Sequence, residues 1–471
     1  MIAISHVAAV LDAAPRGLIF TLVAGCALLA LATTRPYRGG DAYCRGARIM
    51  KGRTVRRRLI GWWRTATRRR VTLAAVPIEL FEEAKHFKLI GTTGTGKSTA
   101  IAELLRGLLA RGDRAVIADP DEGYLARFHM ALRGDVILNP FDGRALRWDP
   151  MAELVGPADP EQLAASLIAA GDDAAGREWR LYARTFLASV LRRVRERDGD
   201  VADLWHLVSV ASGSDLRPLL QDTPAQSFLD PENARMFGSI RSVAAACTAA
   251  LEHVRAQRAC GFSVRQWVRT GSGVLFLPYR AGQIAALRTL IASWMRLALF
   301  EAMDGPAGDR RMWFIVDELD ALGAIEGLRD ALARLRKFGG RCVLGMQSVA
   351  QVSAIYGAGD AQTIIENCGN TLVLRCSASE RGGTAQFCSR LIGEREVLRR
   401  TVSRGRDSPG GWGGGSRSAR RSEHRSAQRV TELAVLPSEI EQLPDFAGYL
   451  KTAGSAYWLK VRVCRTGSRR R

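Results

Sequence analysis

The sequence has no Cys-x-x-Cys pair and no internal repeat. It contains nine cysteines, an odd number, and their spacings fit no zinc-binding pattern. We therefore exclude a structural zinc site and a disulfide framework. Reduced cysteines in a cytosolic domain are the expectation.

Acidic residues are also few. The 471 residues include 68 Lys and Arg but only 47 Asp and Glu, which gives a net charge of +21. This excess favours an anionic partner, either nucleic acid or an anionic membrane surface. Hydrophobic residues make up 47% of the chain, enough for a packed core. The length allows one large domain or two to three ordinary ones.

One uncharged stretch lies near the N-terminus. Gly17–Thr34 is mostly apolar, and as a helix it would reach about 27 Å, close to the roughly 30 Å of a bilayer core. We predict a membrane anchor within residues 1–36. A cleaved signal peptide is the first alternative, given the small residues of Ala30-Leu31-Ala32, although only Arg16 makes the preceding region basic. A buried core helix is the second. Met1–Leu11 is apolar but too short to span, and it is interpreted as the remnant of another transmembrane helix.

The segment after the anchor is strongly basic. Residues 35–70 hold thirteen Lys or Arg and one acid, Asp41. Basic flanks stay in the cytoplasm, so we place the bulk of the chain beneath a bacterial inner membrane. Arginine clusters also bracket Trp62 and Trp63, a combination that suits an anionic leaflet. DNA contact and a solvated charge run remain the alternatives for residues 37–70.

The chain from residue 71 onward alternates between strand and helix patterns. We expect strands at Val71–Ile78, Lys88–Ile90 and Arg114–Ala118 and a helix at Ser98–Arg111, the start of a parallel α/β sheet. Residues 151–262 are helical in pattern. Sheet patterns return at Val274–Leu277, Trp313–Val316, Cys342–Gly345 and Thr371–Leu374.

These patterns predict a nucleotide-binding α/β domain, 71–182 with 263–460, interrupted by an all-α domain at 183–262. The segment 404–428 is rich in Gly, Ser and Arg, and we expect a flexible loop there. Residues 461–471 form a basic tail.

The most specific motif is Gly91-Thr92-Thr93-Gly94-Thr95-Gly96-Lys97-Ser98, followed by Thr99, which matches the phosphate-binding loop in full. The glycines let successive N–H groups face the phosphates of a nucleotide such as ATP. The helix N-terminus adds partial positive charge. Lys97 would neutralise the β- and γ-phosphates and Ser98 would ligate Mg²⁺. The alternative is an ordinary glycine-rich turn that caps a helix.

A second motif, Met312–Glu318, is an apolar run that ends in two carboxylates. Asp317 would hold Mg²⁺, and Glu318 would polarise the attacking water as a general base. The alternative is a buried strand that ends in a solvated turn.

Two more side chains are candidates for the same chemistry. Gln347 follows the strand expected at Cys342–Met346 and could sense the γ-phosphate; its alternative is a helix N-cap. Arg336 lies on a predicted helix, Gly327–Phe338, and could stabilise the γ-phosphate of a neighbouring subunit. Its alternative is a solvated basic face.

These motifs, in this order, resemble the conjugative coupling proteins of the TraD type, membrane ATPases of type IV secretion. The resemblance covers about Arg45 to Lys460. Besides the motifs above, it is carried by Arg45–Ile49, by His86, by Leu138–Asp142 with Arg144 and Trp148, and by the run from Phe314 through Gly339-Gly340 to Ser348. It implies a RecA-like domain with an inserted all-α domain, assembled as a hexameric ring around a DNA channel. It also implies the roles given above for Lys97, Ser98, Asp317, Glu318, Gln347 and Arg336. Members usually have two transmembrane helices, whereas this sequence supports one.

The resemblance implies an ATP-driven motor that delivers single-stranded DNA, with its attached relaxase, to a type IV secretion channel. Its partners would be DNA bound without sequence preference, the relaxase, the channel, the inner membrane and further copies of the chain. A nucleotide-gated receptor without motor activity is one alternative. The others are a coupling ATPase for protein effectors and a chromosome-partitioning pump of the FtsK type. Such a pump would be expected to carry a C-terminal DNA-reading winged helix, and the segment 404–428 with the short stretch after it leaves little room for one.

Overall fold

The computed structural model describes residues 41–51, 70–170, 174–305, 311–379, 383–407 and 420–464. It divides into two compact units. The smaller is Met1–Gly46 with Glu394–Glu432, and the larger is Ala47–Gly393 with Leu433–Arg471. The predicted anchor and most of the basic segment that follows it lie outside the described residues. None of the helices in the described ranges combines the length and apolar character needed to cross a bilayer.

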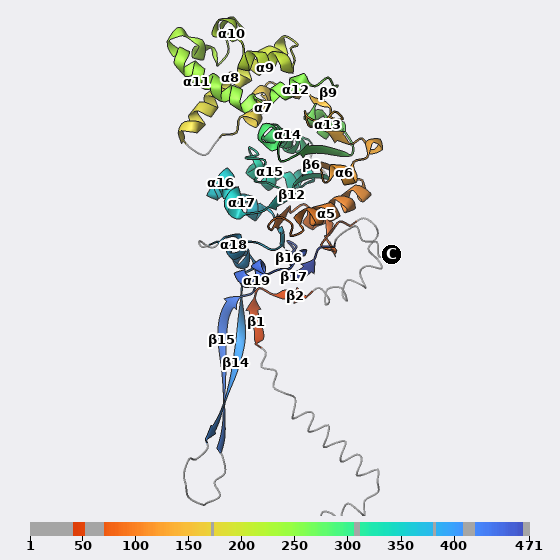
Figure 1. Ribbon diagram of the computed structural model, residues 1–471, viewed down its shortest axis with the longest axis vertical. Coiled ribbons are helices and arrows are strands. Elements are labelled where there is room, and N and C mark those ends of the chain that lie inside the picture. The colour runs from red at the N-terminus through yellow and green to blue at the C-terminus, as the bar shows by residue number, and fades with distance from the viewer. Residues whose placement is uncertain are drawn as a thin grey trace, which may run out of the picture. The chain divides into compact units, whose positions relative to one another are not determined.

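The larger unit is built on one sheet, which contains ten strands among the described residues (Figure 1). From edge to edge, the order is β2 (Ile49–Lys51), β17 (Trp458–Arg462), β16 (Ala447–Lys451), β13 (Asn370–Val373), β5 (Phe87–Ile90), β12 (Gly340–Met346), β11 (Met312–Val316), β6 (Arg114–Pro120), β10 (Val274–Tyr279) and β7 (Val136–Ile137). All pairs from β13 to β7 are parallel. The predicted strands from Lys88 to Leu374 are thus confirmed, with boundaries shifted by at most two residues.

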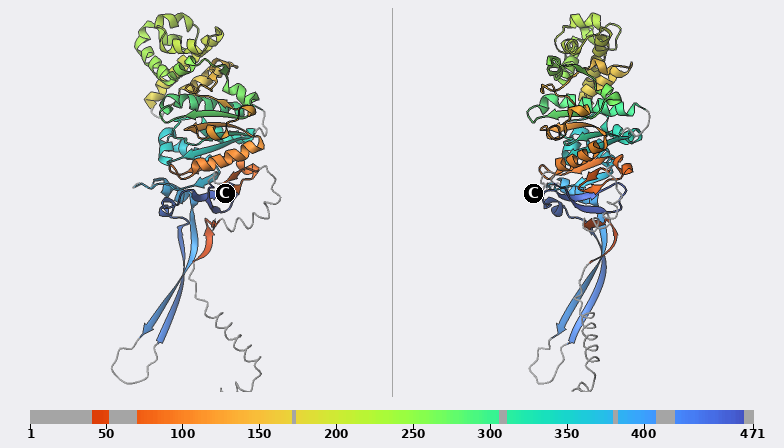
Figure 2. Two further views of the ribbon diagram at one scale, coloured as in Figure 1. Left: turned by 45° about the vertical axis from the view of Figure 1, so that its right-hand side comes forward. Right: turned by 90° about the vertical axis from the view of Figure 1, so that its right-hand side faces the viewer.

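Alternate residues of these strands enter two apolar cores, one on each face. On β6, Ala115 and Ile117 pack with the buried residues of α5 (Lys97–Arg111), whereas Val116 and Ala118 face the other core. That second core contains α14 (Ile284–Met303) and α15 (Leu328–Arg334). Helices therefore cover both faces of the sheet (Figure 2), as expected for parallel strands buried on both sides.

Further short elements lie between the longer strands and helices of the described ranges. They are α4 (Leu80–Glu83), α6 (Leu125–Phe128), α13 (Val264–Thr270), α16 (Val349–Tyr356), α17 (Ala358–Asn367), α18 (Gly383–Ile392), α19 (Pro437–Glu441), the paired strands β8 (Arg147–Trp148) and β9 (Gly261–Phe262), and five 3₁₀ turns (Ala131–Arg133, Met151–Glu153, Gln226–Leu229, Pro231–Asn233 and η5, Leu335–Phe338).

Helices fill the span where helical patterns were predicted. They are α7 (Asp159–Leu167), α8 (Ala174–Glu196), α9 (Val201–Ser209), α10 (Gly213–Leu219), α11 (Ala234–Thr248) and α12 (Leu251–Ala256). Their buried residues, such as Phe186 and Phe237, belong to the same apolar core as one face of the sheet. The limits of an all-α domain at 183–262 stay a prediction.

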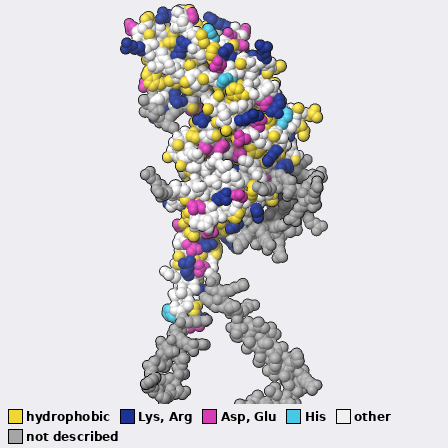
Figure 3. Space-filling view, viewed as in Figure 1, with side chains coloured by type: hydrophobic (Ala, Val, Ile, Leu, Met, Phe, Trp, Pro, Cys, Tyr) yellow, Lys and Arg dark blue, Asp and Glu magenta, His cyan; other side chains and the backbone are white. Residues whose placement is uncertain are grey.

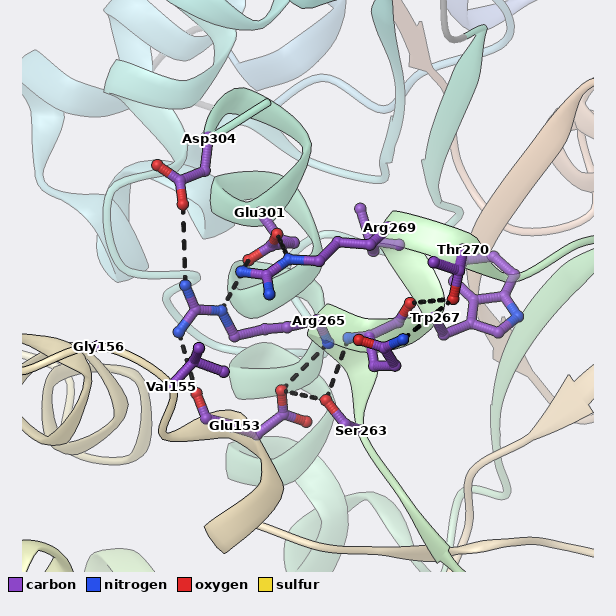
Figure 4. Close-up of polar contacts among 12 residues, drawn as sticks. Glu153, Val155, Gly156, Ser263, Arg265, Trp267, Arg269, Thr270, Glu301 and Asp304 are labelled. Carbon is purple, nitrogen blue, oxygen red and sulfur yellow. Dashed lines mark hydrogen bonds and ion pairs between the residues drawn. The ribbon is translucent and has the colours of Figure 1, made fainter. Parts of the chain in front are cut away.

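A buried polar cluster joins the two ends of this helical part. Glu153 accepts hydrogen bonds from Trp148 Nε1 (2.9 Å), Ser263 Oγ (2.9 Å) and the Val264 backbone N–H (2.7 Å). Arg265 bonds Glu301 on α14 at 2.7 Å (Figure 4). Burial raises the pKa of Glu153, while these hydrogen bonds oppose the rise. The chain that leaves the helices is thereby bonded to the chain that enters them.

The strand predicted at Val71–Ile78 was wrong in form. The segment is a tight hairpin of β3 (Thr72–Leu73) and β4 (Val76–Pro77). Ala74 and Ala75 turn the chain with φ of 51° and 61°. Glu103 of α5 accepts hydrogen bonds from Thr72 Oγ1 at 2.6 Å and the Ala75 backbone N–H at 2.8 Å. This helix contact supports a left-handed turn that the alanines alone would not favour.

The smaller unit contains a three-stranded sheet of β1 (Ala42–Gly46), β14 (Glu394–Asp407) and β15 (Arg420–Leu433), in the order β1-β14-β15. Both ends of the segment predicted as a flexible loop, 404–407 and 420–428, therefore lie in strands. Residues 408–419 lie outside the described residues. Composition indicated a solvated segment, but cross-strand hydrogen bonds to the backbone do not depend on composition.

Charged side chains of both signs share the surface of the larger unit. On the face drawn in Figure 3, Lys and Arg are interspersed with Asp and Glu. The described residues on this face therefore offer no single basic patch that would mark a path for a polyanion.

Candidate functional site

The loop between β5 and α5 wraps tightly because of its glycines. Gly94 and Gly96 have φ of 76° and 114°, a region that favours glycine. A Cβ on Gly96 would lie 2.9 Å from Cδ1 of Phe446, and one on Gly91 would lie 2.8 Å from Cβ of Leu374. Helix α5 begins at Lys97, so its unpaired N–H groups face the loop. The result is a concave backbone with partial positive charge.

This loop borders a cavity of about 490 Å³. Most of the predicted site residues line it, namely Thr93, Gly94, Gly96, Lys97, Ser98, Thr99, Asp317, Glu318 and Gln347. The remaining residues of the loop shape it from behind. The backbone N–H of Thr92 donates to Arg375 O at 2.9 Å, that of Gly91 donates to Met346 O at 3.2 Å, and Thr95 Oγ1 donates to Thr92 O at 2.7 Å.

The Lys97 ammonium group is buried inside the loop. Its Nζ donates to the backbone oxygens of Gly91 at 2.6 Å and Thr92 at 3.3 Å. Burial lowers the pKa of Lys97, and the negative charges of Asp317 and Glu318 oppose that shift. The ammonium group is therefore held by the backbone oxygens of the loop. A bound phosphate would compete with these oxygens for it.

Asp317 follows β11 and is held by two hydroxyl groups. Ser98 Oγ donates to Asp317 Oδ2 at 2.6 Å, and the Tyr124 hydroxyl donates to the same oxygen at 2.8 Å. The other oxygen, Oδ1, is buried and has no hydrogen-bond partner among the described residues. Burial raises the pKa of Asp317, and the bonds from Ser98 and Tyr124 and the charge of Lys97 oppose it. A buried carboxylate oxygen beside a serine hydroxyl suits a hard cation such as Mg²⁺.

Glu318 and Gln347 line the same cavity and are bonded to each other. Gln347 Nε2 donates to Glu318 Oε1, and Thr93 Oγ1 donates to Gln347 Oε1 at 3.1 Å. A chain of hydrogen bonds therefore runs from the loop to the carboxylate. Burial raises the pKa of Glu318, and the nearby charges of Asp320 and Asp317 raise it further. A carboxylate with this raised proton affinity is suited to accept a proton from water.

Among the lining residues that were not predicted from the sequence are Asp121, Tyr124, Arg127 and Phe446. The first three follow β6, whose carboxyl end lies beside that of β11. This adjacency was the available signal, because carboxyl ends of neighbouring parallel strands share one edge. Asp119 shapes the segment by accepting the Leu125 backbone N–H at 2.6 Å. Phe446 is about 350 residues from the loop, and no local pattern marks it.

Arg336 lies away from this cavity. It is exposed, sits on η5, and is not among the lining residues. Gln347 follows the carboxyl end of β12, whereas Arg336 precedes its amino end. Seven strand residues separate these ends by about 20 Å, so Arg336 does not reach the cavity of its own chain.

A glycine-rich loop, two carboxylates and an amide at one edge of a parallel sheet define a P-loop protein of mixed α/β fold. Residues 70–464 match the family described as "Type IV secretion-system coupling protein DNA-binding domain". The chain belongs to this family, and the resemblance to TraD-type coupling proteins is confirmed.

Individual coupling proteins are also similar to this chain. Coupling protein TraD of Escherichia coli (strain K12) is 28% identical over 393 residues, which are 82% of this chain and 53% of TraD. The chain thus spans about half the length of this curated relative. The unbound monoclinic form of the bacterial conjugative coupling protein TrwBdeltaN70 is 31% identical with a TM-score of 0.78, covering 90% of this chain and 94% of that one. TrwB in complex with ADP and Mg²⁺ is also 31% identical, with a TM-score of 0.77, covering 91% and 96%.

Proposed function

We propose that this chain hydrolyses ATP with Mg²⁺ and uses the energy to move single-stranded DNA. It would deliver that DNA, with its attached relaxase, to a type IV secretion channel during conjugation. The observation that carries the proposal is the 2.6 Å bond between Ser98 and Asp317 beside the Glu318–Gln347 pair, all on one cavity behind a phosphate-binding loop. Related structures of TrwB with ADP and Mg²⁺ and with a non-hydrolysable ATP analogue support the choice of ligand.

The loop residues would bind the nucleotide. The N–H groups from Gly91 to Thr99 would cradle the phosphates. Lys97 would exchange the oxygens of Gly91 and Thr92 for the β- and γ-phosphates. Ser98 Oγ and Asp317 would hold Mg²⁺, which supplies positive charge to the phosphate oxygens. The unpartnered Oδ1 of Asp317 provides a further ligand position.

Glu318 and Gln347 would carry out the hydrolytic step. Glu318 would take a proton from the attacking water, and its raised pKa increases its basicity. Gln347 bridges Glu318 and Thr93 of the loop. Loss of the γ-phosphate would therefore be felt at Gln347, which is the role we assign to it as sensor.

Arg336 would act on the site of a neighbouring subunit in a RecA-like hexameric ring. Its distance from the cavity of its own chain supports an action in trans. A cation placed there would stabilise the charge that develops on the γ-phosphate. The strand β12, inserted between β5 and β11, supports the RecA-like assignment.

The chain would have two further partners, DNA and the inner membrane. The net charge of +21 supports contact with phosphates that does not depend on sequence. The apolar stretch Gly17–Thr34 would anchor the chain in the inner membrane, followed by the basic flank that keeps the bulk cytoplasmic. The helical part would carry contacts to the relaxase.

ATPase activity of the full chain in lipid nanodiscs tests the proposal. We expect Glu318→Gln to lower kcat at least 100-fold, and Lys97→Ala to weaken ATP binding. Single-stranded DNA should stimulate the wild type, less so as salt rises. Glu232→Gln, an exposed residue far along the chain, is the matched control and should leave kcat unchanged.

No stimulation by DNA at any salt concentration would contradict the motor. A transfer assay then separates the alternatives. If Glu318→Gln still delivers DNA while bound to ATP, the chain is a nucleotide-gated receptor. If the wild-type chain delivers protein but no DNA, the cargo is a protein effector.

A further inference from the structure

The ribbon of β14 and β15 has a charged distal half. We define the distal half as Arg399–Asp407 with Arg420–Arg429, the residues nearer to the connection between the two strands. It contains eight arginines and two acids, Asp407 and Glu423. Residues Glu423 to Arg429 of β15 are all exposed. By sequence this half carries a net positive charge, and its described side chains at 423–429 are exposed rather than part of a core.

Ion pairs occur along the whole ribbon: in the distal half Arg425 bonds Glu423 at 2.7 Å, and Arg429 lies 3.7 Å from Glu396 at the base. Arg395 donates to Glu432 at 2.8 Å, and Arg399 reaches the same carboxylate at 2.8 Å. Arg45 of β1 bonds Glu396 of β14 at 2.8 Å. The base, residues 394–398 with 430–433, holds three acids and one arginine, whereas the distal half holds eight arginines and two acids, so the net positive charge lies in the distal half.

The register of β1 fixes the direction in which this charge extends. β1 pairs antiparallel with β14, with Ala42 opposite Leu398 and Gly46 opposite Arg395. The chain therefore enters β1 from the side of Leu398, toward the distal half. Beyond Leu398, β14 continues for nine residues, Arg399–Asp407, or about 30 Å.

The sequence places the proposed anchor close to that entry point. Seven residues separate Thr34, the last residue of the apolar stretch, from Ala42. Fully extended, they span at most about 28 Å from one residue to the other. If Gly17–Thr34 crosses a bilayer, β1 begins within that distance of the hydrocarbon core, and the distal half extends toward the same side by a similar length. The headgroup layer lies within its reach.

We propose that the distal half of the β14–β15 ribbon lies against anionic phospholipid headgroups, as a second membrane contact beside the anchor. The inference rests on the anchor in the proposed function. Arginine binds phosphate oxygens through its planar guanidinium group, and juxtamembrane arginines are attracted to anionic leaflets. The ribbon has few apolar residues, such as Val402 and Ala427, so it contacts the surface and does not insert.

Hydrogen exchange of the full chain in nanodiscs tests this contact. One disc contains only phosphatidylcholine, and the other contains phosphatidylcholine with 40% phosphatidylglycerol. We expect backbone exchange in 399–407 and 420–429 to slow at least fivefold in the anionic discs. Exchange in α11 should be equal in both discs.

Two variants separate charge from fold. Arg425→Glu with Arg429→Glu should abolish the slowing in anionic discs, because both side chains would then repel the headgroups. Arg425→Lys with Arg429→Lys should retain most of it, since charge is kept. Loss in both variants would show that the ribbon structure, and not its charge, produces the protection, and this would overturn the proposal.

The remaining outcomes are also decisive. A chain that enters neither disc overturns the anchor, and with it this inference. A chain that enters both discs with equal ribbon exchange overturns the inference alone. If a single-stranded oligonucleotide slows exchange in the ribbon of chains in phosphatidylcholine discs, and anionic lipid does not, the ribbon is a DNA contact instead.

Discussion

At the scale of single residues, Tyr124 holds the carboxylate on which the proposed chemistry depends. Its hydroxyl donates to Asp317 Oδ2 at 2.8 Å, and it also approaches the backbone oxygen of Ser98 at 3.3 Å. Tyr124 is buried, and its ring fixes the direction of the bond. We interpret it as a positioning residue for Asp317.

Tyr124→Phe is expected to lower kcat of the ATPase about tenfold and to raise the Mg²⁺ concentration needed for half activity. A hydrogen bond to a charged group is worth about 1.5–3 kcal/mol, part of which orients the carboxylate. Because the lost bond lowers the pKa of Asp317, that pKa should rise, and the acidic limb of the pH–rate profile should move to higher pH.

Kinetics as a function of Mg²⁺ and pH provide the measurement. Tyr182→Phe, which removes a hydroxyl bonded to Glu178 at 2.7 Å, is the control. Equal Mg²⁺ dependence and equal pH profiles for Tyr124→Phe and wild type would contradict this role.

His86 is a second residue whose environment makes a measurable prediction. Its Nδ1 accepts the Cys342 backbone N–H at 3.0 Å, and its Nε2 lies 3.0 Å from Leu332 O. Because a carbonyl only accepts, Nε2 carries the proton and the ring is neutral. Burial lowers the pKa of His86 from 6.5 to about 4.

The folded state therefore binds fewer protons than the unfolded state between these two pKa values. The contribution of His86 to stability is fully present above pH 6.5 and is lost as pH falls toward 4. Between pH 7.5 and 5 the loss is about 2 kcal/mol.

Urea unfolding at pH 7.5 and 5.0 tests this for wild type and His86→Asn. Asparagine tolerates the left-handed φ of 56° at this position. The pH-dependent loss should be about 2 kcal/mol smaller in the variant. The pH dependence of the unfolding free energy must be compared between the two proteins, and not read from the wild type alone. Burial raises the pKa of Asp119 to about 6, so protonation of Asp119 stabilises the folded state as pH falls, opposite to the effect of His86. Equal pH dependence in both proteins would argue against a neutral buried His86.

At the scale of elements, the close approach of β11 and β12 places the two carboxylates. The strands are parallel, with Val316 opposite Leu344. Immediately beyond that pair, a Cβ on Gly345 would lie 2.0 Å from the backbone oxygen of Asp317. Leu319 N–H bonds Gly345 O at 3.0 Å, which secures the turn after Glu318. The absence of a side chain at Gly345 thus allows the backbone of Asp317 to lie against β12, which fixes the position of Asp317 and Glu318 at the end of β11.

Gly345→Ala is expected to destabilise the fold by about 3 kcal/mol, because backbone must move away from the added methyl group. The matched control is Gly238→Ala in α11, where a Cβ meets nothing within 4 Å. That change should stabilise the protein by about 0.5–1 kcal/mol. Thermal or urea unfolding measures both, and equal stability of the two variants would contradict this account of the strand pair.

At the scale of the whole molecule, the site of one chain lacks the arginine that we assign to it. Arg336 lies at the end of β12 that is opposite to Gln347, so an assembly of chains would complete the site. The proposed hexamer would then be required for ATP hydrolysis, because each site would need Arg336 from a neighbouring chain.

Mixing two inactive variants tests that statement. Arg336→Ala and Glu318→Gln chains should each have little activity. In a random one-to-one mixture, about one interface in four joins an intact Glu318 to an intact Arg336, so about a quarter of wild-type activity should return. Dissociation and reassembly before the ATPase assay are required. Mixtures no more active than their components would place Arg336 outside the shared site.

The sequence by itself determined the phosphate loop, the strands that carry Asp317, Glu318 and Gln347, and the family. These features are local: glycine conformations, apolar runs and polar residues at strand ends are set within a few neighbours. Only the tertiary structure brought Tyr124 to Asp317 and Phe446 to Gly96, since those contacts join segments about 190 and 350 residues apart. It also turned Val71–Ile78 into a hairpin and residues 404–407 and 420–428 into strands. In both places backbone geometry is decided by a partner, Glu103 in one case and a neighbouring strand in the other, and no local pattern specifies the partner.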